Sequence, residues 1–122
     1  MNVLVISTGG TIASTTNDRG ALVPTLTGDE LVARCGTTRQ VRAIDVASLD
    51  SSSMDLAEID LLRETVRTSL LDDSASLVIT HGTDSMAETA LALDLVHAGP
   101  RPVVLTGAMR SAAVSYTHLT LP

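Results

Sequence analysis

Three short apolar runs constrain the fold of this 122-residue chain more than any other feature. They occupy residues 3–6, 77–79 and 103–105, and none of them alternates apolar with polar side chains. Continuous apolar runs of this length are typical of strands that are covered on both faces, as in a parallel sheet. Residues 39–47 have looser apolar spacing and predict a fourth strand.

Helices are expected between these strands. Apolar residues recur at helical spacing between positions 56 and 70, which predicts an amphipathic helix there. Residues 85–88 (SMAE) match a capping box and predict a helix over residues 89–98, which Gly99 and the following proline end. A shorter helix is expected to begin near Thr27. Strands that alternate with helices predict an open α/β sheet with right-handed crossovers.

Composition narrows the classes of function. The chain is 44% apolar but has no Phe or Trp, so its core must consist of Val, Leu, Ile and Ala. The net charge of −6 argues against nucleic acid and anionic membrane surfaces as partners, because both require basic residues. The lone Cys35 excludes an internal disulfide and a cysteine-based zinc site. No segment is long enough to span a membrane and no secretory signal is recognisable, so a cytoplasmic location is expected.

Each of the three main apolar runs ends in the same kind of sequence. Residues 7–9 (STG), 80–82 (THG) and 106–108 (TGA) combine small hydroxyl residues with glycine. Glycine lets a ligand come close to the backbone. In open α/β sheets, ligands bind at the edge where the strands end. The sequence therefore predicts a binding site at this edge.

The side chains near these strand ends suggest the chemistry of a hydroxyl nucleophile. Thr11 follows two glycines whose N–H groups could hold an oxyanion, although this turn also fits a simple strand exit. Thr83 and Asp84 offer a hydroxyl and a carboxylate that could bind an ammonium group. His81 could act as a base, but a hydrogen-bonded packing role is preferred. Residues 50–54 (DSSSM) either hold a small carboxylate or form an ordinary loop. No phosphate-binding or dinucleotide fingerprint is present.

Taken together, these segments resemble the bacterial-type L-asparaginase family. Residues 8–13 (TGGTIA) and 80–90 (THGTDSMAETA) are similar to its two signatures, and residues 106–110 (TGAMR) resemble the segment beside the site. The resemblance implies an α/β fold with three layers: an open, mostly parallel sheet with helices on both faces, as in Rossmann and flavodoxin-like folds. It covers residues 1–110 as the family's N-terminal domain, without the family's second, smaller domain.

The resemblance also implies an activity, the hydrolysis of L-asparagine to L-aspartate and ammonia without a metal or organic cofactor, and it leaves L-glutamine open as a second substrate. By position, Thr11 is the nucleophile, and Thr83 and Asp84 form a second catalytic group that also contacts the substrate. Asp84 holds the substrate's amino group, and Ser51 and Ser52 hold its α-carboxylate. Full-length members of the family are homotetramers, arranged as dimers of dimers.

Three departures from the family pattern reduce the activity expected of the chain. Family members use a lysine downstream of the second signature, whereas all eight basic residues here are arginines. Many members place a tyrosine in the loop after the first signature, but residues 14–23 contain none. Residues 111–122 do not resemble the family, and we hypothesise that this tail is foreign or mis-joined. Little or no turnover is therefore expected.

Two other functions and one structural outcome stay open at this point. The same signatures occur in the component of a tRNA-dependent amidotransferase that releases ammonia from an amide. A binding module for asparagine or aspartate would use the same side chains without turnover. The chain could also fail to fold stably, because an exposed sheet edge leaves apolar surface in water.

Overall fold

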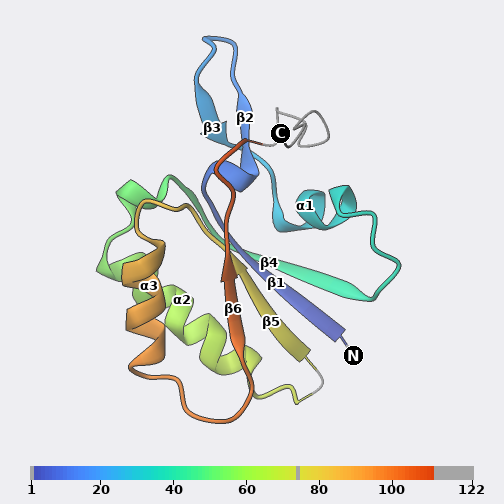
Figure 1. The fold of residues 1–122 in the computed structure, drawn as a ribbon, viewed down its shortest axis with the longest axis vertical. Helices are drawn as coiled ribbons and strands as arrows, with labels where there is room; N and C mark the ends of the chain where they lie inside the picture. The colour runs from blue at the N-terminus through green and yellow to red at the C-terminus, as the bar shows by residue number, and fades with distance from the viewer. Residues whose placement is uncertain (1, 74, 112–122) are drawn as a thin grey trace, which may run out of the picture.

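The computed structural model describes residues 2–73 and 75–111, and its centre is a four-stranded sheet (Figure 1). The strands lie in the order β4, β1, β5, β6, and each neighbouring pair is parallel. This arrangement confirms the predicted strands, including the fourth. Their bounds are Asn2–Gly9 for β1, Val41–Leu49 for β4, Ala75–Thr80 for β5 and Val103–Thr106 for β6.

Parallel pairing brings the carboxyl ends of all four strands to one edge of the sheet. In register, Ser7 of β1 lies opposite Thr80 of β5, and Thr80 lies opposite Thr106 of β6. The pairing of β1 with β4 shifts register between Ser7 and Gly9. The turns that follow the strands consequently leave the sheet side by side.

The helices cover both faces of the sheet, as predicted (Figure 1). α2 (Leu56–Ser69) and α3 (Met86–Asp94) lie on one face, where Leu62 and Leu93 join the core. The first turn of α1 (Gly28–Arg34) lies on the other face, against β4 and the end of β1. Right-handed crossovers require this split, because the chain moves from β1 to β4 and then back past β1 to β5.

The core is aliphatic, as the composition predicts. Burying a Leu or Ile side chain fully contributes about 1.5–3 kcal/mol, so a few such residues can hold a small sheet against its helices. Leu56, in the first turn of α2, is 80% exposed, so the predicted apolar face of this helix is buried only further along. The cluster of buried residues consists of Leu4, Ile6, Leu62, Val66, Ala75, Leu77, Ile79 and Leu93.

Of the three α-helices in the described residues, α1 and α2 begin with a capping box. Asp55 accepts a hydrogen bond from Ala57 N at 2.9 Å, and the Glu58 carboxylate accepts one from Asp55 N at 2.9 Å. Thr27 and Glu30 make the same exchange at the start of α1, which confirms the predicted beginning of this helix. Each box satisfies backbone N–H groups that would otherwise lack partners.

The capping box predicted for α3 is wrong. Ser85 occupies the cap position but makes no side-chain hydrogen bond to the helix. Its hydroxyl donates instead to the Ser51 carbonyl in a neighbouring turn, at 2.7 Å. The helix also begins three residues earlier than predicted and ends at Asp94, short of position 98.

A β-hairpin that the sequence did not predict follows β1. It consists of β2 (Ser14–Thr16) and β3 (Leu22–Pro24), and it extends away from the sheet (Figure 1). The Asn17 side chain closes its tip by accepting hydrogen bonds from the backbone N–H groups of Arg19 and Ala21, both at 2.9 Å. Three-residue strands are too short to produce a periodic pattern, which explains why the sequence did not reveal them.

Most of the predicted tail lies outside the described residues. Residues 112–122 are not described, and Ser111, the first residue of the tail, is buried. The tail hypothesis therefore stays a prediction. Among residues 2–73 and 75–111, no helix has both the length and the apolar character needed to cross a bilayer.

Candidate active site

The turns after β1 and β5 pack directly against each other at the carboxyl edge of the sheet. A side chain on Gly10 would place its Cβ 2.4 Å from Gly82 N and 2.5 Å from Gly82 Cα. Only glycine permits two backbones to approach this closely. Thr11 follows Gly10, and Thr83 and Asp84 follow Gly82. The two turns that carry the predicted catalytic residues therefore share one edge.

This contact lies at the point where the strand order reverses. The chain leaves β1 toward β4 on one side, and it leaves β5 toward β6 on the other. Connections that diverge in this way open a crevice between the two central strands, and ligands of open α/β sheets bind there. The β1–β5 junction is thus the position in this fold where a ligand site is expected.

Local geometry fixes the backbone around Thr11. Gly9 and Gly10 have φ angles of 101° and 80°, which glycine adopts at little cost. The Gly10 carbonyl accepts hydrogen bonds from Ser14 Oγ at 2.8 Å and from Ala13 N at 3.1 Å. Because the peptide group is planar and trans, the Thr11 N–H points opposite to that carbonyl. Such a fixed N–H can stabilise negative charge on an oxygen.

The second turn separates exposed from buried functional groups. Thr83 and Asp84 are exposed, whereas His81 is completely buried. The His81 Nδ1 lies 2.6 Å from the Gly82 carbonyl oxygen, and its Nε2 lies 2.9 Å from Thr89 Oγ1. Both ring nitrogens are therefore occupied, and the preferred interpretation of His81 as packing behind the turn is confirmed.

A third turn lies beside the second and contains the predicted carboxylate-binding serines. Ser51 is buried and Ser52 is exposed. Ser51 Oγ accepts a hydrogen bond from Ser85 N at 3.2 Å, and the Ser51 carbonyl accepts one from Ser85 Oγ at 2.7 Å. A Cβ on Gly82 would lie 2.6 Å from Ser51 Oγ, so these two turns are also in close contact.

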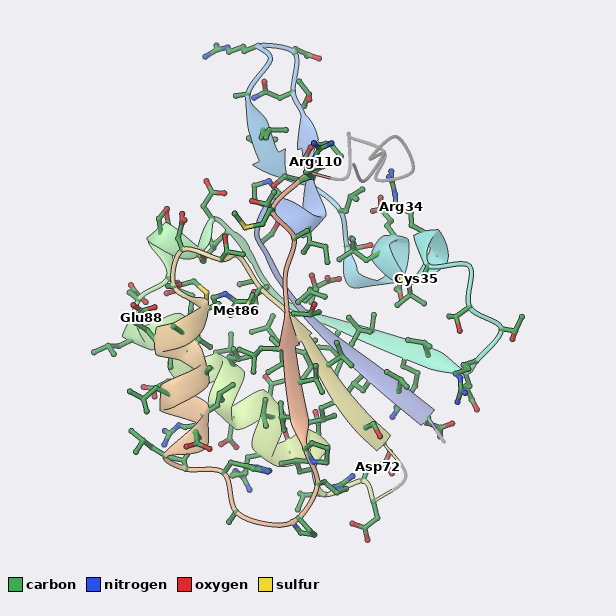
Figure 2. The ribbon with its side chains drawn as sticks, viewed as in Figure 1. Arg34, Cys35, Asp72, Met86, Glu88 and Arg110 are labelled. Atoms are coloured by element: carbon green, nitrogen blue, oxygen red, sulfur yellow. The ribbon has the colours of Figure 1, made fainter. Side chains whose placement is uncertain are left out.

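The turn after β6 completes the edge. A Cβ on Gly107 would lie 2.5 Å from the His81 carbonyl oxygen, 2.7 Å from Met86 Cε and 3.5 Å from Thr83 Cγ2. Figure 2 shows Met86 at the start of α3 and Arg110 beyond the end of β6, near the base of the hairpin. The segment that resembles the family's third motif therefore lies beside Thr83.

The predicted site is an open edge. A cavity of about 840 Å³ lies elsewhere, between α2, α3 and β6, and none of the residues described in the four turns lines it. Within the described part of the chain, no group of three or more His, Cys, Asp or Glu side chains is arranged to hold a metal ion.

Sequence reasoning missed the features that hold these turns together. Ser85 has the composition and position of a helix cap, so nothing in the sequence indicated its bond to Ser51. Gly82 and Gly107 have ordinary backbone angles, and only the spatial packing reveals that their positions exclude a side chain. The repeated glycine at the strand ends was the available signal, and it predicted close approach of a ligand rather than of another turn.

Comparisons with known proteins agree with this arrangement. Residues 2–118 match the family model described as "Asparaginase, N-terminal". The chain is 38% identical over 114 residues to an L-asparaginase of Bacillus licheniformis, covering 89% of this chain and 35% of that protein. It is 33% identical over 114 residues to one component of the glutamyl-tRNA(Gln) amidotransferase of Methanosarcina barkeri, covering 90% of this chain and 27% of that protein.

A solved structure supports the same assignment. The thermostable L-asparaginase from Thermococcus kodakarensis superposes with a TM-score of 0.83 at 31% identity, over 95% of this chain and 36% of that one. The chain thus spans about a third of the length of the relatives that it matches. From the signatures, the fold and these matches, the chain belongs to the asparaginase family of amidohydrolases and forms the N-terminal domain of that family.

Proposed function

We propose that this domain serves an enzyme that hydrolyses L-asparagine to L-aspartate and ammonia. The observation that carries the proposal is the contact between Gly10 and Gly82, which sets the Thr11 turn against the turn of Thr83 and Asp84. A nucleophile, a second hydroxyl and a carboxylate then act on one substrate molecule. Such proximity replaces a collision between separate molecules by a reaction within one complex.

In the proposed mechanism, Thr11 Oγ1 attacks the carbon of the substrate's side-chain amide. The Thr11 N–H stabilises the oxyanion that forms. Thr83, oriented by Asp84, passes the proton of Thr11 to the leaving nitrogen, and the C–N bond breaks to release ammonia. Water then attacks the acyl-threonine, releases L-aspartate and returns a proton to Thr11. These steps use no cofactor.

Substrate recognition in this proposal rests on two charges of the amino acid. The Asp84 carboxylate binds the α-ammonium group, and the hydroxyls of Ser51 and Ser52 bind the α-carboxylate. L-glutamine carries the same two groups and one additional methylene. A single methylene typically changes selectivity by only about 10- to 200-fold, so both amides are candidate substrates.

The absent lysine and tyrosine limit the expected rate. Groups that act as a catalytic unit lose most of their rate when one member is missing. The chain contains no lysine, and residues 14–23 contain no tyrosine. We therefore expect this chain alone to bind L-aspartate, the product, but to hydrolyse little or no L-asparagine.

Ammonia release from L-asparagine by the purified chain tests the mechanism, with the Thr11→Ala variant as the control. Weak turnover that this variant abolishes would support Thr11 as the nucleophile. Turnover that Thr11→Ala leaves unchanged would refute this role. Robust turnover by the chain as it stands would show that the expected loss of activity is wrong.

A second candidate function is the ammonia-releasing component of a tRNA-dependent amidotransferase. The 33% identity to a component of the Methanosarcina barkeri glutamyl-tRNA(Gln) amidotransferase favours it. The net charge of −6 is unfavourable for direct contact with tRNA. Co-purification with tRNA or with a synthetase-like partner would support this candidate over the free hydrolase.

A third candidate is a module that binds asparagine or aspartate without turnover. Calorimetry with L-aspartate is combined with the ammonia assay to compare the two: binding without any hydrolysis favours the module, whereas weak hydrolysis that Thr11→Ala abolishes favours the enzyme. Assembly into a dimer of dimers and a cytoplasmic location stay predictions. Sedimentation of the chain tests the first, and fractionation of the source cells tests the second.

A further inference from the structure

We propose that Ser85 is a positioning residue that prepares Ser51 to bind the substrate's α-carboxylate. The inference rests on the proposed function, in which Ser51 contacts that group. Ser85 occupies the cap position before α3 and belongs to the second signature, whereas Ser51 belongs to the turn after β4. Neither the resemblance nor the family match assigns a role to Ser85.

Two hydrogen bonds and one packing contact join the two turns. Ser85 Oγ donates to the Ser51 carbonyl at 2.7 Å, and Ser85 N donates to Ser51 Oγ at 3.2 Å. Gly82 lies so close behind Ser51 that an added Cβ would fall 2.8 Å from Ser51 Cβ. The backbone and the side chain of Ser51 are thus fixed from the same element that carries Thr83 and Asp84.

Ser85 makes these bonds at the expense of its own helix. A serine at a cap position ordinarily accepts hydrogen bonds from the first N–H groups of the helix, and replacing it by alanine costs about 0.5–2 kcal/mol. Ser85 makes no such bond, although α1 and α2 both have complete capping boxes. Among the α-helices of the described residues, α3 alone departs from this rule, and such departures are expected at functional sites.

The bond from Ser85 N leaves Ser51 with the hydrogen-bonding capacity that a carboxylate requires. A serine hydroxyl has one proton and two lone pairs. The Ser85 N–H occupies one lone pair, so the proton of Ser51 Oγ stays available to an acceptor. A carboxylate only accepts, and its charge strengthens the bond. The hydroxyl of Ser51 can therefore act as a donor to an anionic group.

Calorimetry with two ligands tests this role. L-aspartate is the product of the proposed reaction, and β-alanine is the same molecule without the α-carboxylate. The wild-type chain is expected to bind L-aspartate more tightly. Ser85→Ala is expected to weaken L-aspartate binding about three- to tenfold, the effect of one hydrogen bond, and to leave β-alanine binding unchanged. Ser85→Thr, which keeps a hydroxyl, is expected to restore the preference.

Ser53→Ala is the matched control, because Ser53 is an exposed serine of the same turn. It should leave the preference for L-aspartate intact. If Ser85→Ala weakens both ligands equally, or weakens neither, Ser85 has only a structural role and the inference is wrong while the proposed function stands. If the wild-type chain does not discriminate between the ligands, or binds neither, the proposed role of Ser51 fails, and this inference fails with it.

Discussion

The two ends of the sheet are closed in opposite ways. At the amino end, Gly36 and Gly99 adopt positive φ angles of 62° and 114°, and a Cβ on either would find no atom within 4 Å. At the carboxyl end, a Cβ would come within 2.4–2.6 Å of a neighbouring atom at four glycines: Gly9, Gly10, Gly82 and Gly107. Glycine thus supplies only backbone freedom at the amino end, whereas at the carboxyl end it also permits close contact between turns.

At the amino end of the sheet, the long side chain of Arg101 joins neighbouring segments by hydrogen bonds. At the carboxyl end, close contacts between the turns join them instead. The Arg101 guanidinium donates to the carbonyls of Asp72 at 2.6 Å and Ala75 at 2.7 Å, and also to that of Leu70. These bonds satisfy carbonyls between the end of α2 and β5. At the carboxyl end the turns pack closely through their glycines, and the side chains of Thr83 and Asp84 stay exposed to solvent.

The largest effect is expected from Gly10→Ala. The new Cβ would meet the Gly82 backbone at 2.4 Å and would sit at a φ angle of 80°. With a ψ angle of −176°, this backbone conformation is essentially restricted to glycine and costs another residue roughly 1–3 kcal/mol, and overpacking adds roughly 1–3 kcal/mol. We expect the free energy of unfolding, measured with urea, to fall by about 3 kcal/mol or more.

Gly36→Ala is the control for this prediction, because it combines a φ angle of 62° with open space. Only the conformational cost applies there, roughly 1–2 kcal/mol. Equal losses of stability for the two variants would show that the contact between the turns is not tight. The contrast between the two ends would then be wrong.

Gly82→Ala is expected to have the next largest effect. The backbone at Gly82 has no positive φ angle, so the cost comes only from the contact of the new Cβ with Ser51, 2.6 Å from its Oγ. We expect roughly 1–3 kcal/mol of destabilisation. Because the contact is with a side chain, Ser51→Gly combined with Gly82→Ala should cost less than the sum of the single changes. If the losses of unfolding free energy measured with urea are additive, the strain in Gly82→Ala does not come from the Ser51 side chain.

Sequence reasoning recovered the parts of the fold that depend on continuous patterns. The apolar runs 3–6, 77–79 and 103–105 within β1, β5 and β6 are continuous, and the capping signal at Thr27 is complete within four residues, so each could be recognised locally. The short hairpin strands contain too few residues for any period. Their pairing depends on the turn at Asn17 and on the base of the hairpin, where Ser48 Oγ donates to the Pro24 carbonyl at 2.8 Å.

The position of the candidate site in the fold was predictable, but its internal connections were not. Parallel strands place their carboxyl ends together, so Thr11 and Asp84 could be assigned to one edge from the sequence alone. The choice of Ser85 between capping α3 and bonding Ser51 depends on how near the two turns lie. The local sequence does not determine the distance between the two turns. The capping pattern therefore predicted a bond from Ser85 to its own helix rather than to Ser51.

Arg101→Ala tests the amino end of the sheet, where it should lower stability without changing ligand binding at the carboxyl end. The carbonyls of Leu70, Asp72 and Ala75 would lose a charged donor, and bonds of this kind contribute about 1.5–3 kcal/mol. Because solvent can replace part of them, we expect a loss of about 2 kcal/mol with L-aspartate affinity unchanged. Arg101→Lys should recover little, since lysine lacks the planar fork of donors. A fall in L-aspartate affinity would show that the two ends are coupled.

The smallest effect is expected on the exposed surface of α2, away from both ends. Arg67 Nε donates to Glu64 Oε2 at 2.9 Å, and this hydrogen bond is the main reason that the pKa of Glu64 lies below its ordinary value. A lowered pKa means that the pair stabilises the fold above the unfolded pKa of Glu64 and that this contribution is lost as the pH falls through the folded pKa. Both side chains are more than half exposed, so the gain at neutral pH is slight.

Carboxyl NMR titration of Arg67→Gln tests this directly: the pKa of Glu64 should rise toward its ordinary value, with little change in urea unfolding at neutral pH. Arg63→Gln is the matched control, because Arg63 lowers the Glu64 pKa less than Arg67 does. If Arg63→Gln raises that pKa as much, general surface charge rather than the hydrogen bond sets it. If Arg67→Gln lowers the free energy of unfolding as much as Arg101→Ala does, the stabilising contacts are not concentrated at the two ends of the sheet.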